Sequence, residues 1–235
     1  MEEQYHRYSR NIARLGKDGQ KRLREAKVLV CGLGGLGSGV VAALGGYGIG
    51  KIGLLDFDTV QLSNLNRQFI HRNCDVGKTK TSSAARFLEE FNPEIVQVLY
   101  NKKLDENFVL QGFDVVIDCF DNFESKLLLN RLAVQEGVSL VHGGVEDFKG
   151  QVITIKPAQT ACLACVLGDC KEPAMSLAAL PSAVNTISAI QANECVKILL
   201  SLEGTLYNKL LRLDLLKYEF KVVNLEKNPK CKVCG

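Results

Sequence analysis

The sequence lacks any apolar run long enough to cross a membrane, which takes about 18 or more consecutive apolar residues. Its richest apolar stretch, residues 40–49, is short and interrupted by glycines. The first seven residues, MEEQYHR, lack the apolar core of a secretory signal peptide. We therefore expect a cytoplasmic protein with no membrane partner.

The sequence also lacks a strong excess of charge of either sign. It has 29 Lys and Arg against 26 Asp and Glu, which gives a net charge of +3 over 235 residues. Binding to nucleic acid or to an anionic membrane typically requires a much larger basic excess. With 46% hydrophobic residues the composition is that of a globular protein, and no repeat, low-complexity tract or linker divides the chain. We expect a single domain over residues 1–235.

Short apolar strands alternate with helical segments over the first two thirds of the chain. This alternation predicts a mostly parallel sheet with helices on both faces. The expected strands are residues 27–31, 51–56, 95–99, 114–118 and 138–141, and the expected helices are 5–26, 35–48, 79–91 and 123–136. Residue 151 begins a strand with no following helix, and residues 161–181 are irregular. The remaining expected elements are the strands 151–155, 211–214 and 218–223 and a long apolar helix over 182–202.

A glycine-rich motif, G-x-G-x-x-G, follows the first strand at Gly32, Gly34 and Gly37. Such glycines allow a tight turn and a close approach of the backbone to a phosphate at a helix N-terminus. Asp56 lies 19 residues beyond Gly37, at the end of the second strand, where a carboxylate can accept hydrogen bonds from a ribose. The motif predicts nucleotide binding but does not choose between ATP and a dinucleotide. A turn that only packs strand on helix is the alternative. A Walker A loop ending at Gly77-Lys78-Thr79 is excluded, because Arg72 occupies the position of its first glycine.

A polar loop at residues 56–69 follows the second strand and carries several amides and a guanidinium group. The carboxyl ends of parallel strands are where ligands of open sheets bind. A loop of this kind suits a site that stabilises charge on a nucleotide phosphate, whereas a dinucleotide oxidoreductase has no general need of it.

Five motifs in this order and spacing resemble the successive signatures of the ubiquitin-activating-enzyme-like ThiF/MoeB/HesA family. They are Gly32–Gly37, Leu54–Asp58, Ser63–Gln68, Val76–Lys80 and Asp118–Asn122. The N-terminal segment Arg7–Arg10 and two C-x-x-C pairs also fit, so the resemblance covers nearly the whole chain. It implies an α/β, Rossmann-like, mostly parallel sheet with antiparallel strands added in the C-terminal part and a zinc-stapled C-terminus.

Members of this family adenylate the C-terminal carboxylate of a small ubiquitin-fold carrier protein that ends in Gly-Gly. The resemblance implies an adenylyltransferase that uses ATP and Mg²⁺ and activates a ThiS/MoaD-like sulfur carrier for thiamine or molybdopterin-type biosynthesis. A cysteine desulfurase or a rhodanese would donate the sulfur. The implied nucleotide-binding residues are Gly32, Gly34, Gly35, Gly37, Asp56, Asp58, Ser63, Asn64, Arg67, Gln68, Lys80, Asp121 and Asn122. The implied catalytic residues are Arg67, Lys80, Asp121, which would bind Mg²⁺, and Arg10, which would reach into the site of a partner subunit in a homodimer.

The residue types agree with this chemistry. A carboxylate is already ionised at pH 7, so it needs no general base to attack the α-phosphorus of ATP. What it needs is fixed positive charge to stabilise the negative charge that gathers in the transition state. The three histidines, His6, His71 and His142, form no visible cluster and are not required. As alternatives, Arg67 and Lys80 are ordinary surface charges, or Asp118 and Asp121 only cap a helix.

Nine cysteines in a reducing compartment are not expected to form disulfides. Two C-x-x-C pairs, Cys162/Cys165 and Cys231/Cys234, suit a closed tetrahedral zinc site with a structural role. Zinc would tie the C-terminus back to the irregular segment after residue 157. The single domain would then consist of an N-terminal helix (1–26), a nucleotide-binding core (27–157) and a zinc-stapled C-terminal part (158–235). A redox dithiol and unliganded cysteine pairs are the alternatives. Cys170 is either a sulfur-relay thiol, as in some family members, or a plain loop thiol. The other four cysteines are expected mainly to pack, and they are Cys31, Cys74, Cys119 and Cys195.

Two other functions compete with this hypothesis. The chain could be a non-catalytic, zinc-stapled partner subunit of an activating enzyme, although the complete set of Arg67, Lys80 and Asp121 argues against that. It could also be a nicotinamide-dependent oxidoreductase, which would leave the loop 63–68 and the cysteine pairs unexplained.

Overall fold

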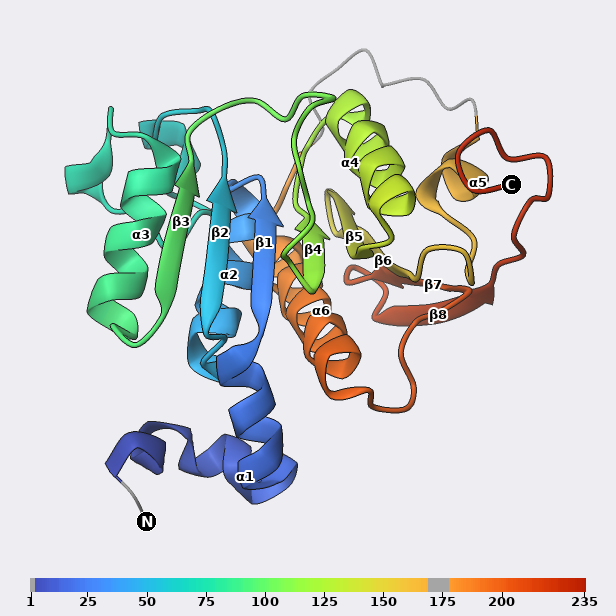
Figure 1. Cartoon of the computed structure of the whole chain (residues 1–235). Helices are drawn as coiled ribbons and strands as arrows, with labels where there is room; N and C mark the ends of the chain where they lie inside the picture. Colours follow the sequence, from blue (N-terminus) through green and yellow to red (C-terminus); the bar gives the residue numbers. More distant parts are fainter. Residues whose placement is uncertain (1–2, 169–177) are drawn as a thin grey trace.

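The computed structural model describes residues 3–168 and 178–235, which contain an eight-stranded sheet with the order β3-β2-β1-β4-β5-β6-β7-β8 (Figure 1). The strands are β1 (Lys27–Cys31), β2 (Lys51–Leu55), β3 (Val96–Tyr100), β4 (Val115–Asp118), β5 (Ser139–Glu146), β6 (Lys149–Ile155), β7 (Lys209–Asp214) and β8 (Glu219–Asn224). The first five pair in parallel, and β6, β7 and β8 continue the sheet antiparallel. This confirms the predicted mostly parallel sheet with antiparallel strands added in the C-terminal part.

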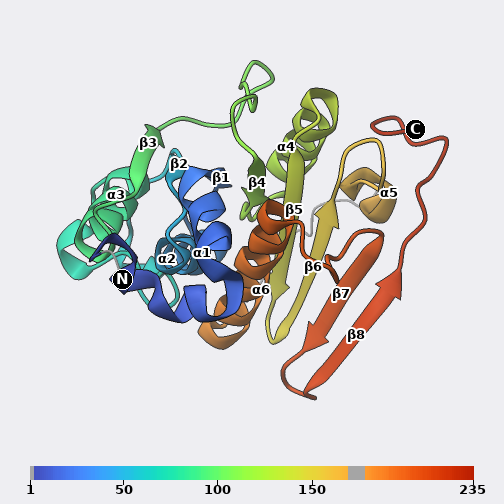
Figure 2. The same ribbon diagram turned by 60° about the horizontal axis from the view of Figure 1, so that its bottom comes forward.

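Helices cover both faces of this sheet (Figure 2). The α-helices are α1 (Ser9–Glu25), α2 (Gly35–Tyr47), α3 (Lys80–Phe91), α4 (Phe123–Glu136), α5 (Leu163–Leu167) and α6 (Pro181–Leu200). Three short 3-10 helices accompany them, η1 (Glu3–Tyr8), η2 (Leu62–Asn64) and η3 (Asn73–Asp75). Apolar side chains of α1, α2, α3 and α6 share one core, and those of α4 and α5 share the other. None of the described helices is long and apolar enough to cross a bilayer.

Strand β1 shows how the apolar runs of the sequence produce these two cores. Val28 and Val30 join the core under α2 and α6, whereas Leu29 and Cys31 join the core under α4. All four side chains are buried, because successive residues of a strand point to opposite faces and both faces carry helices. The continuous run Val28–Cys31 is therefore the expected signature of a central parallel strand.

The structure differs from the sequence prediction at three places. β5 was expected at 138–141 but continues to Glu146, because β6 pairs with it across Gly143 and Gly144. α1 is broken at Gly16, whose φ of 73° is outside the helical region. The segment expected to be irregular contains α5 at its start. For β5, pairing with β6 outweighs the apolar pattern, and for α1, the backbone conformation of Gly16 outweighs it.

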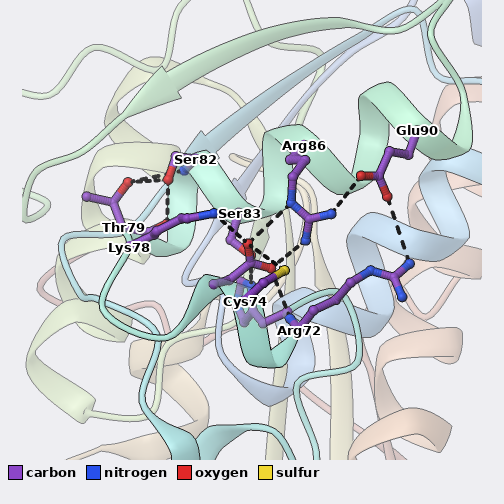
Figure 3. A network of polar contacts seen from close by, with 10 residues as sticks. Arg72, Cys74, Lys78, Thr79, Ser82, Ser83, Arg86 and Glu90 are labelled. Carbon is purple, nitrogen blue, oxygen red and sulfur yellow. Dashed lines mark hydrogen bonds and ion pairs between the residues drawn. The ribbon is translucent and has the colours of Figure 1, made fainter.

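A buried carboxylate organises the segment that leads into α3 (Figure 3). Asp75 is fully buried in η3 and receives hydrogen bonds from the backbone N–H of Arg72 at 3.0 Å and from the Arg86 guanidinium of α3. Lys78 Nζ lies 3.4 Å from the same carboxylate. Burial alone would raise the pKa of Asp75, but these hydrogen bonds outweigh it and hold the pKa well below its usual range. The network fixes the start of α3, the helix whose first residue is Lys80.

We predict that Asp75→Asn lowers the free energy of unfolding by roughly 3 kcal/mol at pH 7, because it removes the charge that holds Arg86. Since the folded-state pKa of Asp75 is depressed, its contribution is complete above the ordinary carboxyl pKa and is lost as the pH falls. The gap between the free energies of unfolding of wild type and variant, measured by urea unfolding, should therefore narrow below about pH 4. Asp105→Asn, which alters a half-exposed carboxylate, is the matched control. A gap that is constant with pH would contradict this account.

Candidate active site

A cleft of about 1350 Å³ opens at the carboxyl ends of the parallel strands. It collects residues from the glycine-rich loop, from the loop after β2, from α3 and from the segment after β4. Eleven of the predicted site residues line it: Gly32, Gly34, Gly35, Asp56, Asp58, Asn64, Arg67, Gln68, Lys80, Asp121 and Asn122. These residues are spread over about 90 positions of the chain, and the parallel topology brings them to one edge of the sheet.

The glycine-rich loop is packed too tightly for other residues. Gly32 has a φ of 90°, and a Cβ there would lie 2.8 Å from the carbonyl oxygen of Cys119. A Cβ on Gly37 would lie 1.9 Å from the carbonyl oxygen of Gly32, so α2 can start against the loop only with glycine at that position. Gly37 does not line the cleft. Its part is to bring the N-terminus of α2, with its free N–H groups, next to it.

The acidic end of β2 holds both this loop and a buried lysine. Asp56 Oδ2 accepts a hydrogen bond from Leu33 N at 2.7 Å, and Asp56 Oδ1 accepts one from Asp58 N at 2.8 Å. Lys80 Nζ lies 2.8 Å from Asp58 Oδ2 and 3.9 Å from Asp56 Oδ2. The Lys80 side chain is only 9% exposed, so the alternative of an ordinary surface charge is wrong for this residue.

Arg67 and Gln68 line the cleft next to the glycine-rich loop. Arg67 Nη1 donates to Ser63 O at 3.1 Å and to Asn66 Oδ1 at 2.9 Å, and among the described residues no carboxylate pairs with its guanidinium. Gln68 is buried, and its Oε1 has no hydrogen-bond partner within the described part of the chain. A ligand that carries both an anionic group and a hydrogen-bond donor would satisfy these two groups.

Ser63 and Asn64 shape the loop. Asn64 Oδ1 accepts a hydrogen bond from Gln61 N at 3.0 Å and so caps η2. Ser63 is exposed and lies outside the lining of the cleft, and its carbonyl orients Arg67.

Asp121 and Asn122 divide their tasks after β4. Asn122 Oδ1 accepts from Ser125 N at 2.8 Å and caps α4, so the helix cap is Asn122 and neither of the two aspartates considered for it. The Asp121 side chain is exposed in the cleft, and its Oδ1 lies 3.4 Å from Asn122 Nδ2. An exposed carboxylate beside a phosphate-sized space is chemically suited to Mg²⁺, which keeps several waters and takes one or two carboxylates.

Arg10 is a predicted site residue that lies at the other end of the sheet from the cleft of its own chain. It lies exposed on α1, which runs into the amino end of β1, whereas the cleft lies at the carboxyl ends. Its predicted role therefore depends on a second copy of the chain.

A family model described as the ThiF family matches residues 8–233. The chain belongs to the ThiF family. Among its relatives, the SAMP-activating enzyme E1 of Haloferax volcanii is 37% identical over 99% of this chain and 89% of that protein. The molybdopterin-synthase adenylyltransferase of Salmonella typhimurium is 34% identical over 97% and 96%, and the sulfur carrier protein adenylyltransferase of Thermus thermophilus is 34% identical over 99% and 92%. The family predicted from the sequence motifs is thus confirmed.

Solved structures agree with this membership in fold. E. coli MccB with MccA-N7isoASN superposes with a TM-score of 0.89 at 24% identity, covering 98% of this chain and 75% of that one. E. coli MccB with ATP gives a TM-score of 0.84 at 25% identity, covering 98% and 74%. The predicted Rossmann-like architecture therefore matches the fold of solved MccB structures over nearly the whole chain.

Two histidines outside the predicted site help to form this cleft: His142 lines it, and the buried His71 holds the glycine-rich loop. His71 Nε2 donates to Leu33 O at 3.0 Å, and its Nδ1 accepts from Ser83 Oγ at 2.8 Å. Burial lowers the pKa of His71, in keeping with this neutral tautomer. His142 Nδ1 lies 2.6 Å from Asp118 Oδ2 in the floor of the cleft. Their partners are 12 to 38 residues away in the sequence, so no local pattern could have shown either contact.

The four cysteines of the C-x-x-C pairs converge as predicted. The Sγ atoms of Cys162, Cys165, Cys231 and Cys234 all lie within 4.8 Å of one another. Burial opposes ionisation of Cys231, but hydrogen bonds from the neighbouring backbone and thiols lower its pKa to about 7. Four sulfurs at this spacing fit a tetrahedral thiolate site for a soft metal such as Zn²⁺. Cys170 lies outside the described residues, and Cys31, Cys119 and Cys195 are buried as expected, whereas Cys74 is exposed.

We predict that the protein purified without chelator carries one Zn²⁺ per chain, measured by plasma mass spectrometry. The double variant Cys231→Ser/Cys234→Ser should lose it, because two of the four thiolate ligands are gone. Cys74→Ser, which removes an exposed thiol outside the cluster, should keep the metal. Retention of zinc by the double variant would show that the metal is bound elsewhere.

Proposed function

We propose that this chain is an ATP-dependent adenylyltransferase that activates the C-terminal carboxylate of a small ubiquitin-fold carrier ending in Gly-Gly. The acyl-adenylate would serve sulfur transfer in thiamine or molybdopterin-type biosynthesis. The observation that carries this proposal is the union, in one cleft, of the glycine-rich loop with Lys80, Arg67 and Asp121. Relatives named as SAMP-activating, molybdopterin-synthase and sulfur-carrier adenylyltransferases support the same class of substrate.

The reaction needs no proton transfer in its first step. An oxygen of the carrier's carboxylate attacks the α-phosphorus of ATP, the bond from that phosphorus to the bridging oxygen breaks, and pyrophosphate leaves. The carboxylate is ionised at neutral pH, so the residues of the cleft have to hold the reactants in line and stabilise the added negative charge. This explains a site that relies on fixed cations and needs no histidine as a general base for the first step.

Each group in the cleft has a role in this step. The N–H groups at the start of α2 would receive the phosphates, and Asp56 would accept from the ribose with its remaining lone pairs. Lys80 would exchange Asp58 for a phosphate oxygen, and Arg67 would bind a second one. Gln68 Oε1 would find a donor on the nucleotide. Mg²⁺ held by Asp121 would supply further charge neutralisation on the phosphates.

The two competing functions fit less well. A non-catalytic subunit has no need of a cleft that keeps a buried lysine beside an unpaired arginine. A nicotinamide-dependent oxidoreductase would leave unexplained the loop that places Arg67 and Gln68 against Gly34 and Gly35.

In the second half-reaction of the proposed adenylyltransferase, a cysteine desulfurase or a rhodanese would supply sulfur, with AMP as the leaving group.

We predict that Lys80→Gln and Arg67→Gln each lower carrier-dependent ATP–pyrophosphate exchange by at least about 100-fold, the usual cost of removing a group that stabilises transition-state charge. The assay uses small ubiquitin-fold proteins ending in Gly-Gly from the same genome. Lys78→Gln is the matched control, because Lys78 pairs with Asp75 outside the cleft. Equal rates for Lys80→Gln and Lys78→Gln would refute the electrostatic mechanism, and exchange without any carrier-like protein would refute the substrate class.

We further propose a homodimer in which Arg10 of one subunit completes the cleft of the other, since Arg10 is exposed and remote from its own cleft. Arg10→Ala and Lys80→Gln should each be inactive alone. After mixing and subunit exchange, mixed dimers contain one intact site, so about a quarter of wild-type exchange activity should return. Mixing without any recovery, although size-exclusion chromatography shows dimers, would show that each site is built from one chain.

A further inference from the structure

The floor of the cleft contains a buried polar group that the adenylation step does not use. His142 on β5 is 2% exposed, and Asp118 beside it on β4 is fully buried. Lys126 Nζ on α4 lies 3.9 Å from Asp118 Oδ2 and donates to Gly143 O at 3.0 Å. Every polar atom of this network is paired within the described residues except one, His142 Nε2.

The hydrogen bond between His142 Nδ1 and Asp118 determines whether His142 Nε2 is a donor or an acceptor. Asp118 accepts from His142 Nδ1, so the proton of a neutral imidazole sits on Nδ1 and Nε2 carries a lone pair. Burial and the ammonium of Lys126 lower the pKa of His142, which keeps the ring neutral. Nε2 is therefore a hydrogen-bond acceptor, and an unsatisfied buried acceptor costs stability that a ligand could recover.

Gly144 and the Gln151 side chain lie next to this acceptor. His142 and Gly144 point to the same side of β5, and a Cβ on Gly144 would lie 3.7 Å from His142 Nε2 and 3.3 Å from Gln151 Cγ. His142, Gly144 and Gln151 all border the cleft. Nε2 is itself buried, so a donor in the cleft reaches it past Gly144, which has no side chain, once the flexible Gln151 side chain moves aside.

A neutral acceptor does not bind a carboxylate or a phosphate, because those groups offer only lone pairs. It accepts from an N–H or an O–H group. The polypeptide substrate of the proposed reaction offers one close to its reactive end, the N–H of its last peptide bond. Resting on the proposed function, we infer that His142 Nε2 accepts a hydrogen bond from the last peptide N–H of the carrier's tail and thereby holds the terminal carboxylate for attack.

The surrounding cleft provides a path for such a tail. Gly144 is paired with Gln151, Gln151 with Arg212 and Arg212 with Lys221, so these side chains form one row across β5, β6, β7 and β8. All four residues line the cleft. Asp118, the partner of His142, ends β4 only three residues before Asp121. An extended peptide can run over this row and reach the reacting groups with its last residue beside His142.

The experiment is a double-mutant cycle between enzyme and substrate. His142→Asn keeps an N–H for Asp118 but loses the acceptor at the Nε2 position. A semisynthetic carrier with an N-methylated terminal glycine loses the donor. Each change alone should raise the carrier KM in ATP–pyrophosphate exchange by about tenfold, with a smaller effect on kcat. Both together should raise it little further, and the Kd for ATP without carrier is the folding control.

Other outcomes separate the two hypotheses. Suppose that the wild type exchanges pyrophosphate, but the effects of the two changes on the carrier KM multiply, or His142→Asn leaves the carrier KM unchanged. In either case His142 does not bind the tail, and the proposed function stands. If the wild type exchanges with no carrier, the proposed function fails by itself. A readout without turnover is the ¹⁵N resonance of His142 Nε2 on addition of a synthetic tail peptide with a non-hydrolysable ATP analogue. It should shift with the normal peptide and not with the N-methylated one, and no shift with either overturns the inference.

Discussion

The shape of the glycine-rich loop depends on one residue, Leu33, whose backbone N–H and C=O are both held by hydrogen bonds. Leu33 N donates to Asp56 at the end of β2, and Leu33 O accepts from His71 in the following loop. These two contacts come from segments that are 23 and 38 residues away. With the peptide groups on both sides of Leu33 fixed, the loop cannot turn toward solvent, and the free N–H groups at the start of α2 keep their direction before any ligand arrives. A preorganised anion site of this kind has no reorganisation cost at the moment of reaction.

The charges around the start of α3 are also fixed before a ligand binds. Two lysines separated by one residue have opposite surroundings, since Lys78 points to the buried Asp75 and Lys80 points to Asp56 and Asp58 in the cleft. Thr79 caps α3 between them, so the helix start decides which lysine faces which way. Asp56 and Asp58 allow the ammonium group of Lys80 to stay buried in the cleft when no ligand is bound. Because this charge is buried, solvent screens it less than it screens a surface charge.

Much of this could be predicted from the sequence, for identifiable reasons. Apolar runs such as Val28–Cys31 indicate a strand buried on both faces, and the ordered motifs locate eleven residues of one cleft. What depends on contacts between distant segments could not be predicted. The extension of β5 past Gly143 needs β6, and the places of His71 and His142 need partners on other elements. Arg10 shows a further limit, because its motif could not show that the fold places it away from the cleft of its own chain.

The break in α1 has a consequence for the N-terminal arm. A side chain at Gly16 would meet nothing within 4 Å, so glycine is required there for its backbone conformation and not for lack of space. Leu23 and Gln20 are buried and anchor the second half of the helix, Tyr8 is buried just before the first half, and the dihedral angles of Gly16 set the angle between the two halves. Gly16 therefore helps to determine where the Arg10 guanidinium points, although it lies six residues away and does not contact it. Replacing Gly16 would change the direction of the first half of α1 and with it the position of Arg10.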